Sequence, residues 1–286
     1  MNNSNSEVLN RIFSKNTLNA FIQGEAPSSY VTAIERYIKD EQGSNLQKIS
    51  EIYTYLCENH RNEYCFKNTL LNTLLVNHPS HSLKNTSALT EITVHKSKPD
   101  FILINGKAVV YEIKTGLDNF ERLQGQLSDY YKAFDNVIVI TDKGSINSLC
   151  PKLDKFNFAG ISVLNNDLSI EEIKKPISYA EQLDYLVMFK ILRKYEFENI
   201  INDTFGKLPN VSQFEYYDAC FNMIKKLDMK IFFDLFKKEL KKRCVIIESE
   251  FLKLPKELKL LGYFSSLKQK DYFELQKFLN KPYLNQ

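Results

Sequence analysis

The sequence predicts an α/β domain with a mixed sheet, flanked by helical segments. Between residues 89 and 164, short dense runs of β-branched and aromatic residues are typical of buried strands. From residue 181 to 280, leucine, phenylalanine, lysine and glutamate recur at helical spacing instead. We therefore expect a helical N-terminal segment (1–45), an α/β domain (46–176) and an all-helical C-terminal domain (177–286).

The residues before the strands predict three helices. Apolar positions at Val31, Ile34 and Ile38 indicate a helix over 29–39. Similar stripes indicate helices over 46–59 and 61–76.

The strands follow in order. Residues 89–95 alternate between apolar and polar, and 99–104 and 108–115 are two apolar runs joined through Asn105-Gly106, a strong hairpin signal. Asp118 and Glu121 resemble a capping box that opens a helix. A buried strand (137–141) follows, so the order from residue 61 is α-β-β-β-α-β, and a helix (144–154) and a strand (161–164) complete the domain.

Composition excludes several classes of protein. The 286 residues are 43% hydrophobic and 26% charged, as in ordinary globular proteins, and the net charge of +3 is too small to indicate nucleic-acid binding by itself. The five scattered cysteines (Cys57, Cys65, Cys150, Cys220 and Cys244) favour reduced thiols over a disulfide scaffold. There is no signal-peptide pattern and no apolar run long enough for a membrane span, so we expect a cytoplasmic protein without membrane contact.

Three charged residues interrupt the apolar hairpin: Asp100, Glu112 and Lys114. A buried carboxylate needs a partner, so their presence requires an explanation. A two-residue turn would pair Asp100 with Tyr111 and place it opposite the other two. A three-residue loop with Gly106 left-handed would pair Asp100 with Val110 and bring all three charges to one face. We favour the second register, because it sends five large apolar residues to the other face (Phe101, Leu103, Val109, Tyr111 and Ile113).

Two carboxylates and a lysine on adjacent strands suit Mg²⁺ chemistry on phosphate. Mg²⁺ prefers oxygen ligands and retains several waters. The metal polarises a phosphoryl oxygen and acidifies a bound water, while a lysine orients that water or neutralises developing charge.

These residues carry a family resemblance. Pro99-Asp100, eleven intervening residues and Glu112-Ile113-Lys114 resemble the motif of the PD-(D/E)XK nuclease superfamily. Gln126 and Tyr130 are similar to the QxxxY element of its RecB-like members, and Glu63 matches an extra acidic residue that many members place near the metal. The segment looks most like a little-studied bacterial group of this superfamily.

The resemblance implies a restriction-endonuclease-like αβββαβ core and a metal-dependent phosphodiesterase, with DNA favoured over RNA, in a bacterial defence or mobile-element setting. Asp100, Glu112, the Ile113 carbonyl and Glu63 would bind Mg²⁺, for which Mn²⁺ could substitute, and Lys114 would position the attacking water. Gln126 and Tyr130 would support the site. The cysteines do not match the iron–sulfur pattern of some RecB-like members, so we expect no cluster.

Basic residues beside the motif are candidate phosphate contacts, Lys96 and Lys98 above all. Two alternatives stay open. The chain could be a binding module that retains the nuclease fold without catalysis, or the hairpin could be structural while the helical C-terminal domain binds a partner protein or a second copy.

Overall fold

The computed structural model describes residues 3–38, 42–78, 83–115, 118, 120–243 and 246–283. The chain divides into two compact units. The two chain ends, Met1–Leu83 and Cys244–Gln286, form one unit, and Lys84–Arg243 form the other.

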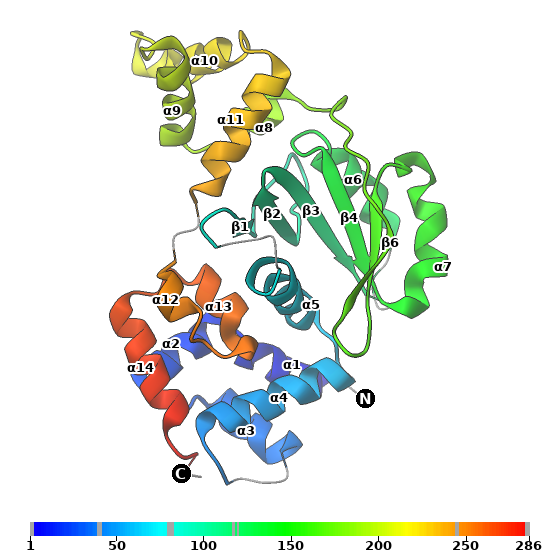
Figure 1. The fold of residues 1–286 in the computed structure, drawn as a ribbon, viewed down its shortest axis with the longest axis vertical. Coiled ribbons are helices and arrows are strands. Elements are labelled where there is room, and N and C mark those ends of the chain that lie inside the picture. The colour runs from blue at the N-terminus through cyan, green and yellow to red at the C-terminus, as the bar shows by residue number, and fades with distance from the viewer. Residues whose placement is uncertain are drawn as a thin grey trace. The chain divides into compact units, whose positions relative to one another are not determined.

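The unit built from the chain ends is helical (Figure 1). Ser44 and Gln47 form a capping box at the start of α4, and the Asn62 side chain caps the first turn of α5. The helices expected at 29–39, 46–59 and 61–76 are confirmed within one or two residues at each end. The N-terminal elements are α1 (Asn3–Ile12), α2 (Lys15–Gln23), α3 (Ser28–Tyr37), α4 (Asn45–Asn59), α5 (Glu63–Leu71) and the π-helical turn η1 (Asn72–Val76). The C-terminal elements are α12 (Glu248–Phe251), η5 (Lys256–Leu258), α13 (Lys259–Phe264) and α14 (Gln269–Asn280).

The α/β unit contains a six-stranded mixed sheet in the order β1-β2-β3-β4-β5-β6. β1, β2 and β3 form an antiparallel meander, β4 and β5 continue parallel to β3, and β6 is antiparallel to β5. β6 is exposed and rich in charged residues, as suits an edge strand. The strands are β1 (Ser87–Leu89), β2 (Phe101–Asn105), β3 (Lys107–Lys114), β4 (Asn136–Thr141), β5 (Gly160–Leu164) and β6 (Ile170–Lys174).

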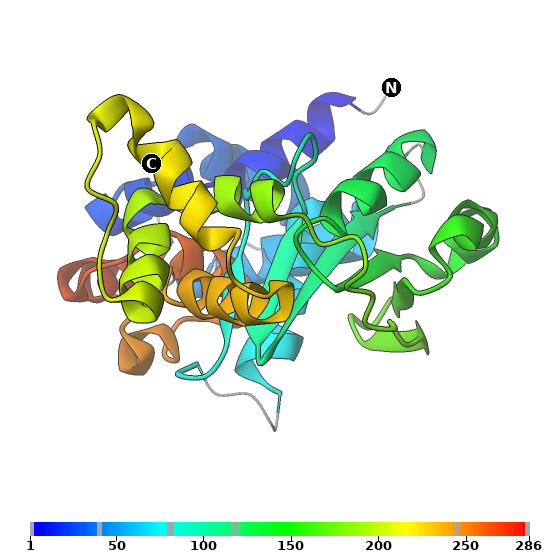
Figure 2. The same cartoon turned by 90° about the horizontal axis from the view of Figure 1, so that it is seen from above.

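The helices of this unit lie beside the sheet and at its end. Figures 1 and 2 both show α9 and α10 at the opposite end of the unit from α7. The expected capping box is wrong, because the Asp118 carboxylate accepts from the N–H and hydroxyl of Thr115 instead. The elements are η2 (Phe120–Arg122), α6 (Leu123–Tyr130), η3 (Lys143–Ser145), α7 (Ile146–Leu149), η4 (Cys150–Phe156), α8 (Tyr185–Ile191), α9 (Lys194–Phe205), α10 (Gln213–Ile224) and α11 (Met229–Lys241).

The hairpin register differs from the one that the sequence favoured. Asn105 pairs with Lys107 and Phe101 with Tyr111, so the next step places Asp100 beside Glu112 and not beside Val110. Gly106 takes the left-handed conformation that we expected (φ +69°), but the loop is centred one residue later in the chain. Because the register moves by two residues, the side chains still divide between the faces as predicted.

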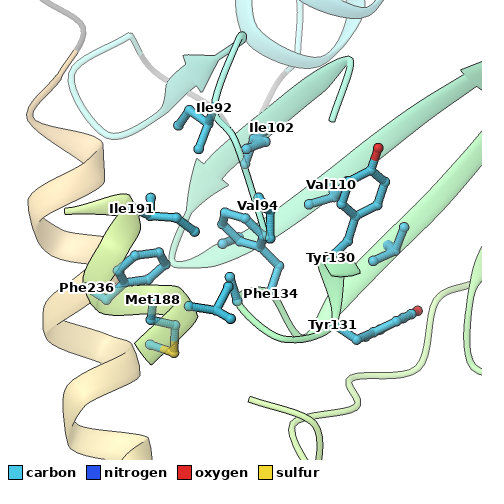
Figure 3. Close-up of a cluster of buried hydrophobic side chains, with 14 of the residues drawn as sticks. Ile92, Val94, Ile102, Val110, Tyr130, Tyr131, Phe134, Met188, Ile191 and Phe236 are labelled. Carbon is cyan, nitrogen blue, oxygen red and sulfur yellow. The ribbon is translucent and has the colours of Figure 1, made fainter. Parts of the chain in front are cut away.

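The strand expected at 89–95 is wrong beyond Leu89. Glu91 and His95 have positive φ (59° and 55°), which interrupts extended backbone after β1. The apolar alternation has another cause: Ile92 and Val94 are loop residues whose side chains enter the core (Figure 3).

The core of the α/β unit lies on the face of the sheet that carries Ile102 and Val110. Leu123, Leu127 and Tyr130 of α6 pack on this face. Figure 3 shows Met188, Ile191 and Phe236, from α8 and α11, in the same cluster.

The division of the chain differs from the three expected parts. Helices α8–α11 belong to the α/β unit, because their apolar side chains join the core on the sheet, whereas α12–α14 join α1–α5. Of the predicted fold class, the α/β assignment with a mixed sheet and many helices is confirmed. Among the described residues, no helix combines the length and apolar character that crossing a bilayer requires.

Candidate active site

Asp100 lies where β2 begins, half-buried beside β3. Its Oδ2 accepts a hydrogen bond from the Ile113 backbone N–H at 2.8 Å. The backbone pairing of β2 with β3 stops at Phe101, so the Asp100 carboxylate serves as the acceptor for this N–H of β3 just beyond the paired residues. In an antiparallel ladder, the N–H and C=O of one residue point to the same side, so the Ile113 carbonyl faces the Asp100 side of β3.

Glu112 lies on the core face of β3 and is only 1% exposed. Its Oε1 pairs with Lys114 Nζ at 2.8 Å, and its Oε2 accepts a hydrogen bond from the Tyr130 hydroxyl at 2.7 Å. A carboxylate buried among apolar side chains is tolerated only with such partners. Each of its oxygens can accept more than one bond, so one protein partner does not exhaust the acceptor capacity of either.

Lys114 ends β3 and is 9% exposed. Its backbone carbonyl accepts a hydrogen bond from the Thr141 hydroxyl at 2.6 Å, which ties the residue to β4. Glu112 and Lys114 thus pair with each other, as a structural hairpin would have them do, but they are buried and not on a solvent face.

Tyr130 and Gln126 occupy one side of α6, one turn apart. The Tyr130 hydroxyl also lies 3.0 Å from the Lys98 carbonyl, so its single proton is shared between that oxygen and Glu112. Burial and the Glu112 carboxylate raise the pKa of Tyr130 well above its usual range, against a lowering by Gln126. The hydroxyl therefore stays a donor at neutral pH.

Gln126 contributes a buried side-chain oxygen to the same region. Its Oε1 is buried and makes no hydrogen bond to the part of the chain that the structure describes. A buried acceptor without a donor is costly, so Gln126 Oε1 is a candidate acceptor for a ligand of this site.

The loop between β1 and β2 carries the two candidate phosphate contacts. Lys96 is exposed, and Lys98 is exposed with its Nζ 3.5 Å from Glu91 Oε2. Asp129 anchors this loop to α6, since its Oδ2 accepts from the Lys96 N–H at 3.2 Å and from the Ser97 hydroxyl at 2.8 Å.

Sequence reasoning did not single out Asp129. Its Oδ1 contacts His95 Nδ1 and Lys132 Nζ, each at 2.9 Å. Partial burial opposes ionisation, but hydrogen bonds from Lys132 and Ser97 lower the pKa of Asp129 on balance. The signal available in the sequence was weak: an acidic residue directly before Tyr130, in a helix that is otherwise uncharged.

Glu63 belongs to the helical unit and not to the α/β unit. It is the first residue of α5, where its carboxylate pairs with Lys67 one turn later. Within the described ranges, no three His, Cys, Asp or Glu side chains are placed to share a metal ion. Within the α/β unit, Asp100 lies beside β3, the strand that carries Glu112, and bonds to the neighbouring Ile113 N–H.

Comparisons with known proteins give one family match. The profile described as "Bacteriophage P4 protein cII" matches residues 57–260, well over half of the chain. No curated protein matches significantly. A solved structure described as a protein of unknown function from Silicibacter pomeroyi is 11% identical, with 46% of this chain and 87% of that chain covered and a TM-score of 0.29. A TM-score this low does not indicate a shared fold.

Proposed function

The chain belongs to the bacteriophage P4 protein cII family, and we propose that its α/β unit is a metal-dependent nuclease that hydrolyses phosphodiester bonds, with DNA as the favoured substrate. One observation carries the proposal: the Asp100 carboxylate bonds to the N–H of Ile113, the residue between Glu112 and Lys114, and the buried Glu112 carboxylate is bonded on both oxygens. A hairpin with only a structural role would gain nothing from burying that charge.

The strand arrangement supports a restriction-endonuclease-like core. β1, β2 and β3 form a meander, α6 follows, and β4 returns parallel to β3. This is the βββαβ part of the order expected from the sequence, with the acidic pair at the second and third strands and Tyr130 on the helix that follows, whereas the expected first helix, α5, belongs to the helical unit.

The donor set fits a hard divalent cation. Asp100, Glu112 and the Ile113 carbonyl offer oxygen ligands on neighbouring strands, and Gln126 Oε1, which has no partner among the described residues, is suited to a coordinated water. Mg²⁺, or Mn²⁺ in its place, would supply charge neutralisation on the phosphate and an acidified water. Glu63 as a further ligand stays a prediction from the resemblance.

The chain's own residues have separable roles in this proposal. Tyr130 fixes the orientation of Glu112 by donating to Oε2. Lys114, held by Glu112, presents a cation beside the scissile phosphate, where it orients the attacking water or offsets developing negative charge. Lys96 and Lys98 would contact backbone phosphates next to the site.

The setting and the partners are also proposals. The family is named after a bacteriophage protein, which agrees with a mobile-element role. A partner protein or second copy would bind helices α8–α11, where Phe214 of α10 is 97% exposed.

The test is cleavage of plasmid, linear duplex, single-stranded DNA and structured RNA with Mg²⁺, Mn²⁺ or EDTA. We expect Lys114→Ala to reduce metal-dependent cleavage at least ~100-fold, because an electrostatic contact at the reacting phosphate is lost. Lys107→Ala is the matched control, since Lys107 is an exposed lysine at the other end of β3.

Equal cleavage by the wild type and Lys114→Ala would refute the site. Metal binding without cleavage of any of the four substrates would favour the binding module that retains the fold.

A further inference from the structure

The loop between β1 and β2 contains a tight turn with a histidine at its tip. Val94 and Ser97 exchange both backbone hydrogen bonds, at 2.8 and 3.0 Å, so His95 and Lys96 form a two-residue turn. His95 has φ +55°, a left-handed conformation that a glycine would adopt without strain. Glu91, four residues earlier, is also left-handed. Non-glycine residues that persist in this conformation are concentrated at functional sites.

Asp129 fixes this turn from α6. Its Oδ1 contacts His95 Nδ1 and Lys132 Nζ, and its Oδ2 accepts hydrogen bonds from the Lys96 N–H and the Ser97 hydroxyl. The next residue, Tyr130, contacts both the Lys98 carbonyl and Glu112. Two consecutive residues of α6 therefore tie the turn to the candidate active site.

The contact with Asp129 sets the orientation of the imidazole. Nδ1 is the atom that lies 2.9 Å from Asp129, so Nε2 lies on the opposite edge of a ring whose side chain is 38% exposed. Because Nδ1 is engaged by Asp129, Nε2 is the ring nitrogen that can meet a ligand, and in an imidazolium it is a second N–H donor.

Charges around His95 favour an anionic ligand. Asp129 and Lys132 face it from α6 and the residues after it, and Lys96, Lys98 and Glu91 lie on its own loop. Three lysines oppose two carboxylates, and protonation of His95 adds a further positive charge to this set.

We propose that His95 is a phosphate-binding residue that contacts the nucleic-acid backbone next to the cleavage site when its imidazole is protonated. The proposal rests on the proposed nuclease function and adds to it a named contact whose charge depends on pH. In a purely structural role, His95 would only tether the turn to Asp129.

His95→Asn separates the two roles. Asparagine tolerates the left-handed conformation, and its amide can still donate to Asp129, so the turn is retained while the titratable charge is lost. Lys175→Asn is the matched control, because Lys175 is an exposed lysine that follows β6, at the far edge of the sheet from β1.

The measurement is duplex DNA binding by the full chain in EDTA, followed by fluorescence anisotropy over a salt series at pH 5.5 and 8.5. Each phosphate contact contributes ~0.9 to the slope of log K against log salt. We expect the wild-type slope to be steeper by ~0.9 at pH 5.5 than at pH 8.5, and His95→Asn to lose that difference. The chain has three other histidines (His60, His78 and His81), so the comparison between the two proteins carries the test.

Three outcomes would overturn the proposal: a wild-type slope that does not change with pH, a His95→Asn variant that keeps the change, or no binding by the folded wild type at pH 5.5. The nuclease proposal has a separate readout, since metal-dependent cleavage and its loss in Lys114→Ala do not involve the charge of His95.

Discussion

Tyr130 illustrates how one side chain serves both packing and chemistry. Its ring packs in the core, and its hydroxyl reaches Glu112. We expect Tyr130→Phe to retain the packing and to lower the free energy of unfolding by ~1–3 kcal/mol, because a buried carboxylate oxygen loses its donor. Cleavage should fall ~10–100-fold, as is usual when the partner of a metal ligand is removed.

The matched control is Tyr131→Phe. The neighbouring Tyr131 hydroxyl is buried and makes no hydrogen bond of ordinary geometry to the described residues. Its removal should leave both urea unfolding and metal-dependent cleavage close to wild type. Equal effects of the two variants would show that Tyr130 acts through packing alone.

At the scale of residues, the sequence singled out the candidate site residues but not the side chains that contact them. Asp100, Glu112 and Lys114 stand out because charges are rare in apolar strands. The grouping of Asp129 with His95 depends on a contact between residues 34 positions apart in the chain, and no local pattern encodes it.

At the scale of elements, a buried ion pair joins helices α8–α11. Arg243, which follows α11, donates from Nε and a terminal nitrogen to the two carboxylate oxygens of Glu196 in α9, at 2.7 and 2.6 Å. The terminal nitrogen also donates to the Ile191 carbonyl, at the end of α8. Lysine cannot form this fork, so Arg243→Lys should lower the free energy of unfolding by ~2 kcal/mol.

This pair should also make stability depend on pH. Burial works against ionisation, but the Arg243 contacts lower the pKa of Glu196 on balance below its ordinary value of 4.5. A lowered pKa contributes stability above the unfolded value, and that stability is lost as the pH falls through the folded pKa. In urea unfolding between pH 3 and 6, the free energy of unfolding should therefore fall less on acidification in Arg243→Lys than in the wild type.

An exposed pair on the same two helices is the control. Lys238 Nζ lies 3.8 Å from Asp203 Oδ2, with both side chains more than half exposed. Lys238→Ala should change the free energy of unfolding by less than ~1 kcal/mol. A similar loss in both variants would contradict a special role for the buried fork.

The elements themselves were predictable where burial and local pattern agree. The strands around 101–105, 107–114 and 136–141 are dense in β-branched residues, and the sequence located them well. β6 was missed because an exposed edge strand with two glutamates and a lysine has no apolar alternation to detect. The segment after Leu89 was wrong because its apolar side chains enter the core from a loop.

At the scale of the whole molecule, the helical unit is discontinuous in the chain. Asn68 of α5 donates to the Lys256 carbonyl and accepts from the Leu260 N–H, and Asn45 of α4 donates to the Phe278 carbonyl. Phe21 and Phe278 stack with their ring centroids 4.7 Å apart. These contacts join segments that are far apart in the chain, and no change in composition marks where they begin. The sequence therefore could not predict that the two chain ends form one unit.

Truncation after Arg243 should therefore affect the two units differently. The remaining N-terminal helices lose the segment that satisfies Asn45 and Asn68, whereas β3 and β4 keep every strand partner. Hydrogen exchange should show lost amide protection in α2 and α4 and retained protection in β3 and β4, because buried amides exchange only through local or global opening. Asn68→Ala in the full chain should weaken protection in the same helices more mildly. Loss of protection in β3 and β4 as well would mean that the α/β unit depends on the chain ends for its fold.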